Sequence, residues 1–335
     1  MAICARCGAW IQHGAVLSTA CHQLHAAGDV VSAINTLRRL IPIHPRALID
    51  SLLTYPRFLG TIKPQLLGRA DAELGARTRS LGTAWWPRTL KCPVGKRVLV
   101  VAPHPDDEAI GPGGFLLRHR GLAELHVVTN FHGERGGRLE RAPWENTPEY
   151  KAEMVATRRD EMGRVAAVLG LASVQRLDVP DGTIDLQPGV VLRLRDAVER
   201  VSPDIVLLPW YLDAHPEHRL TNVLYAWGCA DLSCMVLAYE IWQMLEPNAV
   251  LDITDQLDEK VALVSEYRSQ TATVDYVGFV EGIARTRAFY SPVRKNRNGA
   301  VEAYLALPNG DYCDLVTSVY GADGRLSTDA KRLLA

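Results

Sequence analysis

A short apolar run that ends abruptly in polar residues constrains this chain more than any other feature. Val98–Ala102 contains no polar side chain, and the segment His104–Glu108 that soon follows supplies an imidazole and three carboxylates. A run without polar alternation is typical of a strand that is buried on both faces of a parallel sheet. Ligands of such sheets bind beyond the carboxyl ends of the strands. The sequence therefore predicts a buried central strand with a functional site at its end.

Strand and helix patterns alternate along the chain after this run. The expected elements are, in order, strand 98–102, helix 113–120, strand 125–129, helix 148–169, strand 174–177, helix 190–201 and strand 204–209. Such alternation is typical of a parallel sheet with right-handed crossovers. We therefore expect an α/β fold, a Rossmann-like open and mostly parallel sheet with flanking helices, preceded by a small helical N-terminal segment.

The N-terminal part of the chain has a different pattern. Apolar residues recur at helical spacing between about residues 11 and 82. We therefore divide the chain into a helical N-terminal extension, residues 1–90, and an α/β domain, residues 91–335. Cys4 and Cys7 have the spacing of half a zinc knuckle, but the nearby His13, Cys21, His22 and His25 lack the spacing of its second half, so packed, reduced thiols are the default interpretation. Whether the extension binds a partner stays open.

Charge and composition exclude several classes of function. The formal net charge is -1, and a near-neutral chain lacks the basic surface that binds nucleic acids or anionic membranes. No stretch approaches the ~20 apolar residues of a transmembrane helix, and Met1–Trp10 lacks the apolar core of a signal peptide. The seven scattered cysteines are typical of reduced thiols. We expect a cytoplasmic protein, and a homo-oligomer is compatible with the sequence.

A second polar cluster follows the predicted strand 204–209. His215 and His218 lie three residues apart in the run Pro209–His218. Because both clusters follow the carboxyl ends of strands, the expected sheet brings them to one crevice. Catalytic zinc has three protein ligands and one open position, and two histidines with one carboxylate supply that number. Iron, manganese and cobalt accept the same types of ligand.

The motif His104–Glu108 also resembles the Pro-Asp-Asp-Glu signature of the LmbE-like, or PIG-L, de-N-acetylases. Further residues that agree with the family are, in order, Thr129 with Gly133 and Glu134, Arg158–Glu161, Leu169 with Gly170, Pro180–Gly182, Asp213 with His215 and His218, and Tyr267–Gln270. The resemblance extends from about Arg97 to Tyr304. It departs at Glu217, because the commonest second motif of the family is His-Pro-Asp-His.

The resemblance implies roles for five residues. His104, Asp107 and His218 are the expected ligands of one Zn²⁺ per chain, for which another divalent transition metal could substitute. Asp106 is the expected general base, which takes a proton from the zinc-bound water. His215 is expected to stabilise the oxyanion and to help protonate the departing amine. If the acidic residue of the second motif orients that histidine, the longer side chain here gives the pair a different geometry.

The expected function is that of a zinc-dependent hydrolase that removes an N-acetyl or other acyl group from an amino sugar or a sugar-containing metabolite. Its substrate would then be a small molecule or a glycoconjugate. Two alternatives stay open. One is an amidase that cleaves a larger acyl group or a thiol-conjugate amide, and the other is a non-catalytic sugar-binding protein on the same fold. A binding protein has no need of a base such as Asp106, which favours the enzyme.

Several positions outside the two clusters have more than one interpretation. Asp181 and Gly182 suit a turn or a substrate contact equally well. Arg158 and Glu161, three apart on a predicted helix, either pair with each other or lie buried under the site. Asp213 is expected to support its loop or to orient a metal ligand and not to bind the metal itself.

Overall fold

The computed structural model describes two short N-terminal strands and most of the chain beyond residue 86. The described residues are 2–3, 10–11, 87–91, 93–140, 144–183, 187–291, 293 and 298–320. Internal contacts divide the chain into two units, 1–84 and 85–335. In the first unit, β1 (Ala2–Ile3) pairs antiparallel with β2 (Trp10–Ile11). The predicted N-terminal helices and the Cys4–Cys7 pair lie outside the described residues.

The second unit is built on an eight-stranded sheet. Its strands, in spatial order, are β3 (Arg88–Thr89), β9 (Ala249–Asp252), β10 (Val301–Pro308), β8 (Met235–Tyr239), β7 (Ile205–Pro209), β4 (Arg97–Ala102), β5 (Glu124–Phe131) and β6 (Ser173–Val179). β10 runs antiparallel to both of its neighbours, and all the other pairings are parallel. The prediction of an open, mostly parallel sheet is therefore confirmed.

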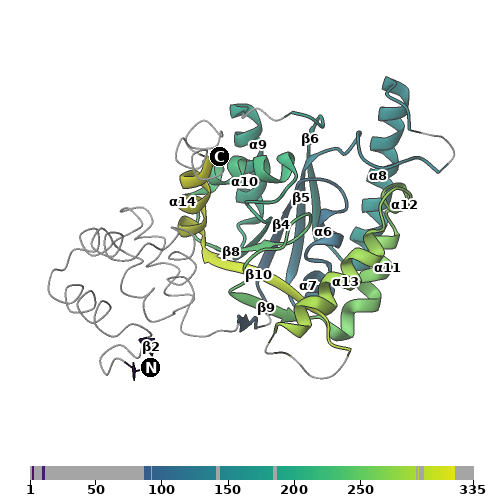
Figure 1. Cartoon of the computed structure of the whole chain (residues 1–335). Helices are drawn as coiled ribbons and strands as arrows, with labels where there is room; N and C mark the ends of the chain where they lie inside the picture. The colour runs from purple at the N-terminus through teal and green to yellow at the C-terminus, as the bar shows by residue number, and fades with distance from the viewer. Residues whose placement is uncertain are drawn as a thin grey trace. The chain divides into compact units, whose positions relative to one another are not determined.

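Helices cover both faces of this sheet. They are α6 (Asp107–Ile110), α7 (Gly113–His119), α8 (Pro148–Leu169), α9 (Pro188–Val201), α10 (Pro216–Cys229), α11 (Leu257–Ser265), α12 (Arg268–Thr271), α13 (Tyr276–Phe289) and α14 (Asn309–Tyr320), with a 3₁₀ turn at Thr254–Gln256. α9, α10 and α14 lie on one side, and α7, α11 and α13 on the other (Figure 1). None of the helices that the structure describes has both the length and the apolar character needed to cross a membrane.

The local sequence explains where the longest helix begins and ends. Pro148 takes the first turn of α8, and the hydroxyl of Thr147 accepts a hydrogen bond from the backbone N–H of Tyr150. Gly170 ends the helix in the left-handed conformation, where glycine has no steric penalty. The observed bounds of α8 are those that its apolar periodicity predicts.

The central strand is buried on both faces, as its composition predicts. Each residue from Val98 to Ala102 is 0 % exposed. β4 lies between β5, which follows it directly in the sequence, and β7, which the chain reaches only after β6. The chain thus adds β5 and β6 on one side of β4 first and then crosses back to place β7 on the other side. This is a topological switch point, where α/β sheets leave a crevice beyond the carboxyl ends of the strands.

Candidate metal and catalytic centre

The two polar clusters meet at this switch point. The loop after β4 carries His104 to Asp106, and the loop after β7 carries Asp213 to His215. β4 and β7 are hydrogen-bonded neighbours, with Val100 opposite Leu207, so their carboxyl ends lie side by side. The sequence clusters therefore occupy one site at the edge of the sheet.

Three side chains converge in this site with the geometry of a metal-binding group. One ligand atom from each of His104, Asp107 and His218 lies within 4.8 Å of the others. Oδ2 of Asp107 is 3.3 Å from Nδ1 of His104 and 3.4 Å from Nε2 of His218. All three are almost fully buried. Two imidazole nitrogens with one carboxylate oxygen form the donor set of catalytic zinc sites, so these residues fit the metal that the sequence predicts.

Electrostatics within this group also suit a cation. Burial by itself raises the pKa of Asp107, but the neighbouring His218 and His104 hold it well below its usual range. Asp107 is therefore ionised at neutral pH. Burial lowers the pKa of His104, and its hydrogen bonds to Asp107 and Glu217 outweigh this and raise the pKa to about 10. A metal ion would replace the extra proton of His104 and neutralise the same carboxylates.

Each of the two histidines has a second carboxylate on its other ring nitrogen. Nε2 of His104 lies 2.7 Å from Oε2 of Glu217. Nδ1 of His218 lies 3.4 Å from Oδ1 of Asp213, a fully buried residue. This longer contact is electrostatic, and the nitrogen is buried without a hydrogen-bond partner among the described residues. Metal-binding histidines commonly have such carboxylate partners, which orient the ring. Asp213 thus supports a candidate ligand, as expected.

Asp106 lies beside the three converging residues in an unusual backbone conformation. Its φ is 137°, in the region that favours glycine. Its carboxylate is 2.9 Å from Nη2 of Arg158. Burial raises the pKa of Asp106 to about 8, although the charge of Arg158 opposes this increase. A carboxyl group with a pKa near neutrality exchanges protons readily, which is the property of a general acid–base residue.

Arg158 is buried beneath the site and does not pair with Glu161. Its guanidinium also donates to the backbone oxygens of Pro105 and Gly133. Glu161 instead accepts hydrogen bonds from the backbone N–H and the hydroxyl of Ser269. Of the two interpretations of this pair, the structure therefore supports a buried role under the site.

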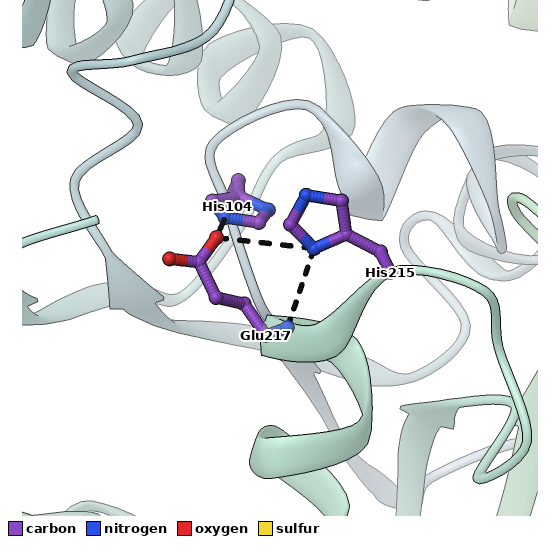
Figure 2. A group of neighbouring side chains, drawn as sticks. All are labelled: His104, His215 and Glu217. Carbon is purple, nitrogen blue, oxygen red and sulfur yellow. Dashed lines mark hydrogen bonds and ion pairs between the residues drawn. The ribbon is translucent and has the colours of Figure 1, made fainter. Parts of the chain in front are cut away.

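His215 caps α10, and its side chain is 35 % exposed. Its ring centroid is 5.2 Å from that of His104 and 4.8 Å from that of His218. The backbone N–H of Glu217 donates to Nδ1 of His215 at 3.3 Å (Figure 2). Burial and the charges of the other two histidines lower the pKa of His215 to about 4. The ring is therefore neutral at pH 7, and because Nδ1 accepts a hydrogen bond, Nε2 carries the proton.

Asp181 and Gly182 form a turn that supports the site. The carboxylate of Asp181 accepts hydrogen bonds from the backbone N–H groups of Gly133 and Arg135. Gly182 has a φ of 83°, and its N–H donates to Oε1 of Glu217 at 2.5 Å. The guanidinium of Arg135 packs against this glycine so closely that a Cβ there would clash with it. The turn interpretation accounts for the contacts of both residues.

An aromatic pair, Trp242 and Tyr276, lies near the polar clusters. Trp242, just beyond the carboxyl end of β8, has a side chain that is 47 % exposed, and its backbone N–H donates to Oδ2 of Asp213. The rings of Trp242 and Tyr276 are 5.8 Å apart and edge-to-face. Burial, with the charges of Asp106 and Asp107, raises the pKa of Tyr276. The sequence analysis missed this pair because neither residue belongs to a motif.

Comparisons with known proteins identify relatives of this chain. The model of the PIG-L family, described as GlcNAc-PI de-N-acetylase, matches residues 99–226. Diacetylchitobiose deacetylase of Thermococcus kodakarensis is 28% identical over 196 residues, which are 52% of this chain and 70% of that protein. 4-Oxalmesaconate hydratase of Pseudomonas putida is 34% identical over 202 residues, 54% of this chain and 76% of that protein.

Solved structures agree with the fold. The conserved protein TT1542 of Thermus thermophilus matches with a TM-score of 0.51 and 26% identity, over 63% of this chain and 94% of that one. An N,N'-diacetylchitobiose deacetylase of Pyrococcus horikoshii matches with a TM-score of 0.54 and 24% identity, over 73% of this chain and 94% of that one. The matched segment 99–226 contains both polar clusters. As the motif after the first strand predicted, the chain belongs to the PIG-L, or LmbE-like, family.

Proposed function

We propose that this protein is a metal-dependent hydrolase that removes an acetyl group from the amine of an amino sugar or a glycoconjugate, with residues 91–335 as its catalytic domain. The observation that carries the proposal is the convergence of His104, Asp107 and His218 beside Asp106. The family relationship supports it, because relatives of this chain include proteins named as deacetylases of amino sugars. A sugar-binding protein would not require the buried carboxyl group of Asp106.

His104, Asp107 and His218 would hold one zinc ion per chain, or another divalent transition metal. When bound, zinc supplies Lewis-acid chemistry: it polarises the amide oxygen and lowers the pKa of water to about 7. The donor set supports this assignment, since it contains two nitrogens and one ionised carboxylate. The carboxylates of Glu217 and Asp213 add negative charge around the ion without needing to contact it.

Asp106 acts as the base that takes the proton from the attacking water. A pKa of about 8 leaves a minor ionised fraction of Asp106 at pH 7 to act as the base, and it lets the protonated form give its proton to the departing amine. Of the two roles expected for His215, stabilising the oxyanion and helping to protonate the amine, we propose the first. With a pKa of about 4 the ring is almost never protonated at pH 7, and its neutral Nε2–H is a donor suited to an oxyanion.

The aromatic pair supports a sugar as the substrate. Trp242 and Tyr276 present a partly exposed, edge-to-face surface beside Asp213. Aromatic faces bind the apolar face of a ring while their polar edges stay in water. A sugar ring that carries the acylated amine would pack here with its amide directed toward Asp106.

The proposal is tested by measuring metal content and acetate release together. Purified protein would be assayed against N-acetylated amino sugars, with Asp106→Asn and the matched surface variant Asp178→Asn, another aspartate with positive φ. We expect one metal ion per chain in all three proteins, and a loss of activity of about 10²–10⁴-fold in Asp106→Asn alone. Absence of bound metal, with no activity after zinc or iron is added, would contradict the proposal. N-acyl substrates of increasing length separate the deacetylase from the larger-acyl amidase.

A hydratase is a second candidate function. The observation that favours it is the 34% identity with 4-oxalmesaconate hydratase over 76% of that protein. Water activation by Asp106 serves addition to a double bond as well as amide hydrolysis. A polycarboxylate substrate needs a cation, and the guanidinium of Arg135, which packs against Gly182 in the turn that supports the site, would supply one. Hydration of an unsaturated polycarboxylate that Arg135→Gln abolishes, without acetate release from any sugar, would favour this function.

A further inference from the structure

We propose that Glu217 is a positioning residue that decides which nitrogen of His104 faces the metal. Its carboxylate holds a proton on Nε2 and so leaves the lone pair of Nδ1 directed at Asp107 and His218. The inference rests on the proposed metal site but not on the identity of the substrate.

The ring of His104 lies between two carboxylates. Nδ1 is 3.3 Å from Oδ2 of Asp107, the oxygen that also lies 3.4 Å from Nε2 of His218. Nδ1 therefore faces the three-residue group. Nε2 points the other way and lies 2.7 Å from Oε2 of Glu217. A neutral imidazole has one N–H, and the shorter hydrogen bond retains it at Nε2 when a metal ion takes the other nitrogen.

Glu217 is itself fixed in place. The residue is 5 % exposed, and its second oxygen, Oε1, accepts the N–H of Gly182 at 2.5 Å. That glycine belongs to the turn in which Asp181 binds the backbone of residues 133 and 135. A carboxylate held on both oxygens cannot swing away from His104, so the orientation of the histidine follows from the turn.

Glu217 interacts with the two neighbouring histidines through different groups. Its backbone N–H donates to Nδ1 of His215, whereas its carboxylate lies 3.8 Å from the same nitrogen (Figure 2). Since that nitrogen already accepts a hydrogen bond, it has no proton for the carboxylate. The side chain of Glu217 therefore hydrogen-bonds to His104, and its backbone N–H hydrogen-bonds to His215. The methylene that glutamate has and aspartate lacks supplies the reach to His104.

Direct metal binding by Glu217 is the competing interpretation. Ligand atoms of His104, His215 and Glu217 also lie within 4.8 Å of one another. However, Nε2 of His104 already contacts the carboxylate at hydrogen-bonding distance. A metal on that nitrogen would have to break this contact and give up Asp107, whose Oδ2 lies between His104 and His218.

The test measures zinc affinity by competition with a chromophoric chelator, which requires no substrate. We expect Glu217→Leu to raise the zinc dissociation constant by about 10–100-fold, the usual effect of losing a carboxylate partner. Glu217→Gln should lose less, because its amide oxygen still accepts from Nε2–H. Glu217→Asp should resemble Glu217→Leu, because its carboxylate falls short. Glu240→Gln is the matched control, because Glu240 is a buried carboxylate that pairs with Arg287 away from the metal group. The zinc affinity of this variant should equal that of wild type.

Nitrogen-15 NMR of histidine-labelled, zinc-loaded protein supplies a second readout. The signals of His104 should show zinc on Nδ1 and hydrogen on Nε2, and the Nε2–H signal should broaden or shift in Glu217→Gln. Zinc on Nε2 of His104, or an unchanged dissociation constant in Glu217→Leu, would overturn the inference. If Glu217→Leu does not fold, the zinc dissociation constant and the His104 signals of Glu217→Gln are compared with those of wild type. No change in either would overturn the inference. Tight zinc binding without acetate release would overturn the proposed function and leave this inference intact.

Discussion

Replacing Arg158 by methionine tests whether its guanidinium holds the charge of Asp106 inside the site. Arg158 is 3 % exposed, and its Nη2 lies 2.9 Å from the Asp106 carboxylate. Methionine keeps much of the side-chain stem but removes the charge and every donor. Removing one partner of a buried ion pair costs about 3–5 kcal/mol, because the other group must either keep an uncompensated charge or take up a proton. We expect the free energy of unfolding to fall by about that amount at a pH where Asp106 is ionised.

The pH dependence follows from the proton on Asp106. Burial raises the pKa of this carboxyl group from 3.8 to about 8 against the field of Arg158, so the variant has a still higher pKa. A group whose pKa is higher in the folded than in the unfolded protein contributes its full stability at pH values below the unfolded-state pKa. That contribution is lost as the pH rises through the folded-state pKa. Above about pH 8, wild type gains the ion pair while the variant retains its proton. The difference in stability therefore widens from about pH 7 to about pH 9.

Urea denaturation of EDTA-treated protein at both pH values measures the effect without a contribution from metal binding. Arg159→Met is the matched control, because Arg159 is the next residue of α8 and pairs with Asp178 at an exposed position. Its change should stay within about 0.5 kcal/mol. A double-mutant cycle of Arg158→Met with Asp106→Asn isolates the pair. A coupling energy near zero, or a loss no larger than that of the control, would refute the reasoning.

Three further predictions follow from other parts of the structure. Burial lowers the pKa of His119 below 6.5, so the unfolded chain binds its proton first and stability falls as pH drops below about 6.5. Denaturation curves of His119→Phe should show a shallower acid loss than wild type, and an unchanged slope would contradict this. Trp242→Ala should raise KM for an N-acetylated sugar by about threefold to tenfold with little change in kcat, and steady-state kinetics that show an unchanged KM would remove the residue from the substrate surface. Glu302 accepts hydrogen bonds from the backbone N–H groups of Gly114 and Phe115 in the first turn of α7 and pairs with the buried Lys260 at 2.6 Å. Glu302→Leu should therefore destabilise the fold by about 3–5 kcal/mol, whereas a loss below about 1 kcal/mol in urea denaturation would mean that the lysine finds another partner.

Much of the sheet could be predicted because the sequence patterns that specify its strands and helices are local. The strand from Val98 and the helix from Pro148 follow from apolar periodicity and capping residues, and the observed elements agree with both. The same holds for the position of the candidate site, since parallel strands direct their loops to one edge. The strand that contains Glu302 is also visible as an apolar run, but its antiparallel direction depends on pairing with β8 and β9. No property of the run itself encodes that choice.

The contacts that tune the site depend on tertiary structure and escaped prediction. Arg158 meets Asp106 across 52 positions of sequence only because α8 packs against the loop after β4. Glu217 was recognised as a departure from the common motif, yet its preference for His104 depends on side-chain length and on the N–H of Gly182. Patterns of residue type identify which groups a site contains, whereas distances within it follow from packing.

The backbone of Asp106 implies a conflict between stability and chemistry at one position. A φ of 137° is a conformation that glycine adopts without strain and that any other residue holds at a cost on the order of 1–3 kcal/mol. Glycine at this position would relieve that strain and make the site chemically inert, but it would also leave the buried guanidinium of Arg158 without its carboxylate. A lineage released from the need for the reaction would therefore gain only by exchanging both residues. Homologous sequences with glycine at the position of Asp106 should accordingly lack the arginine at the position of Arg158 as well.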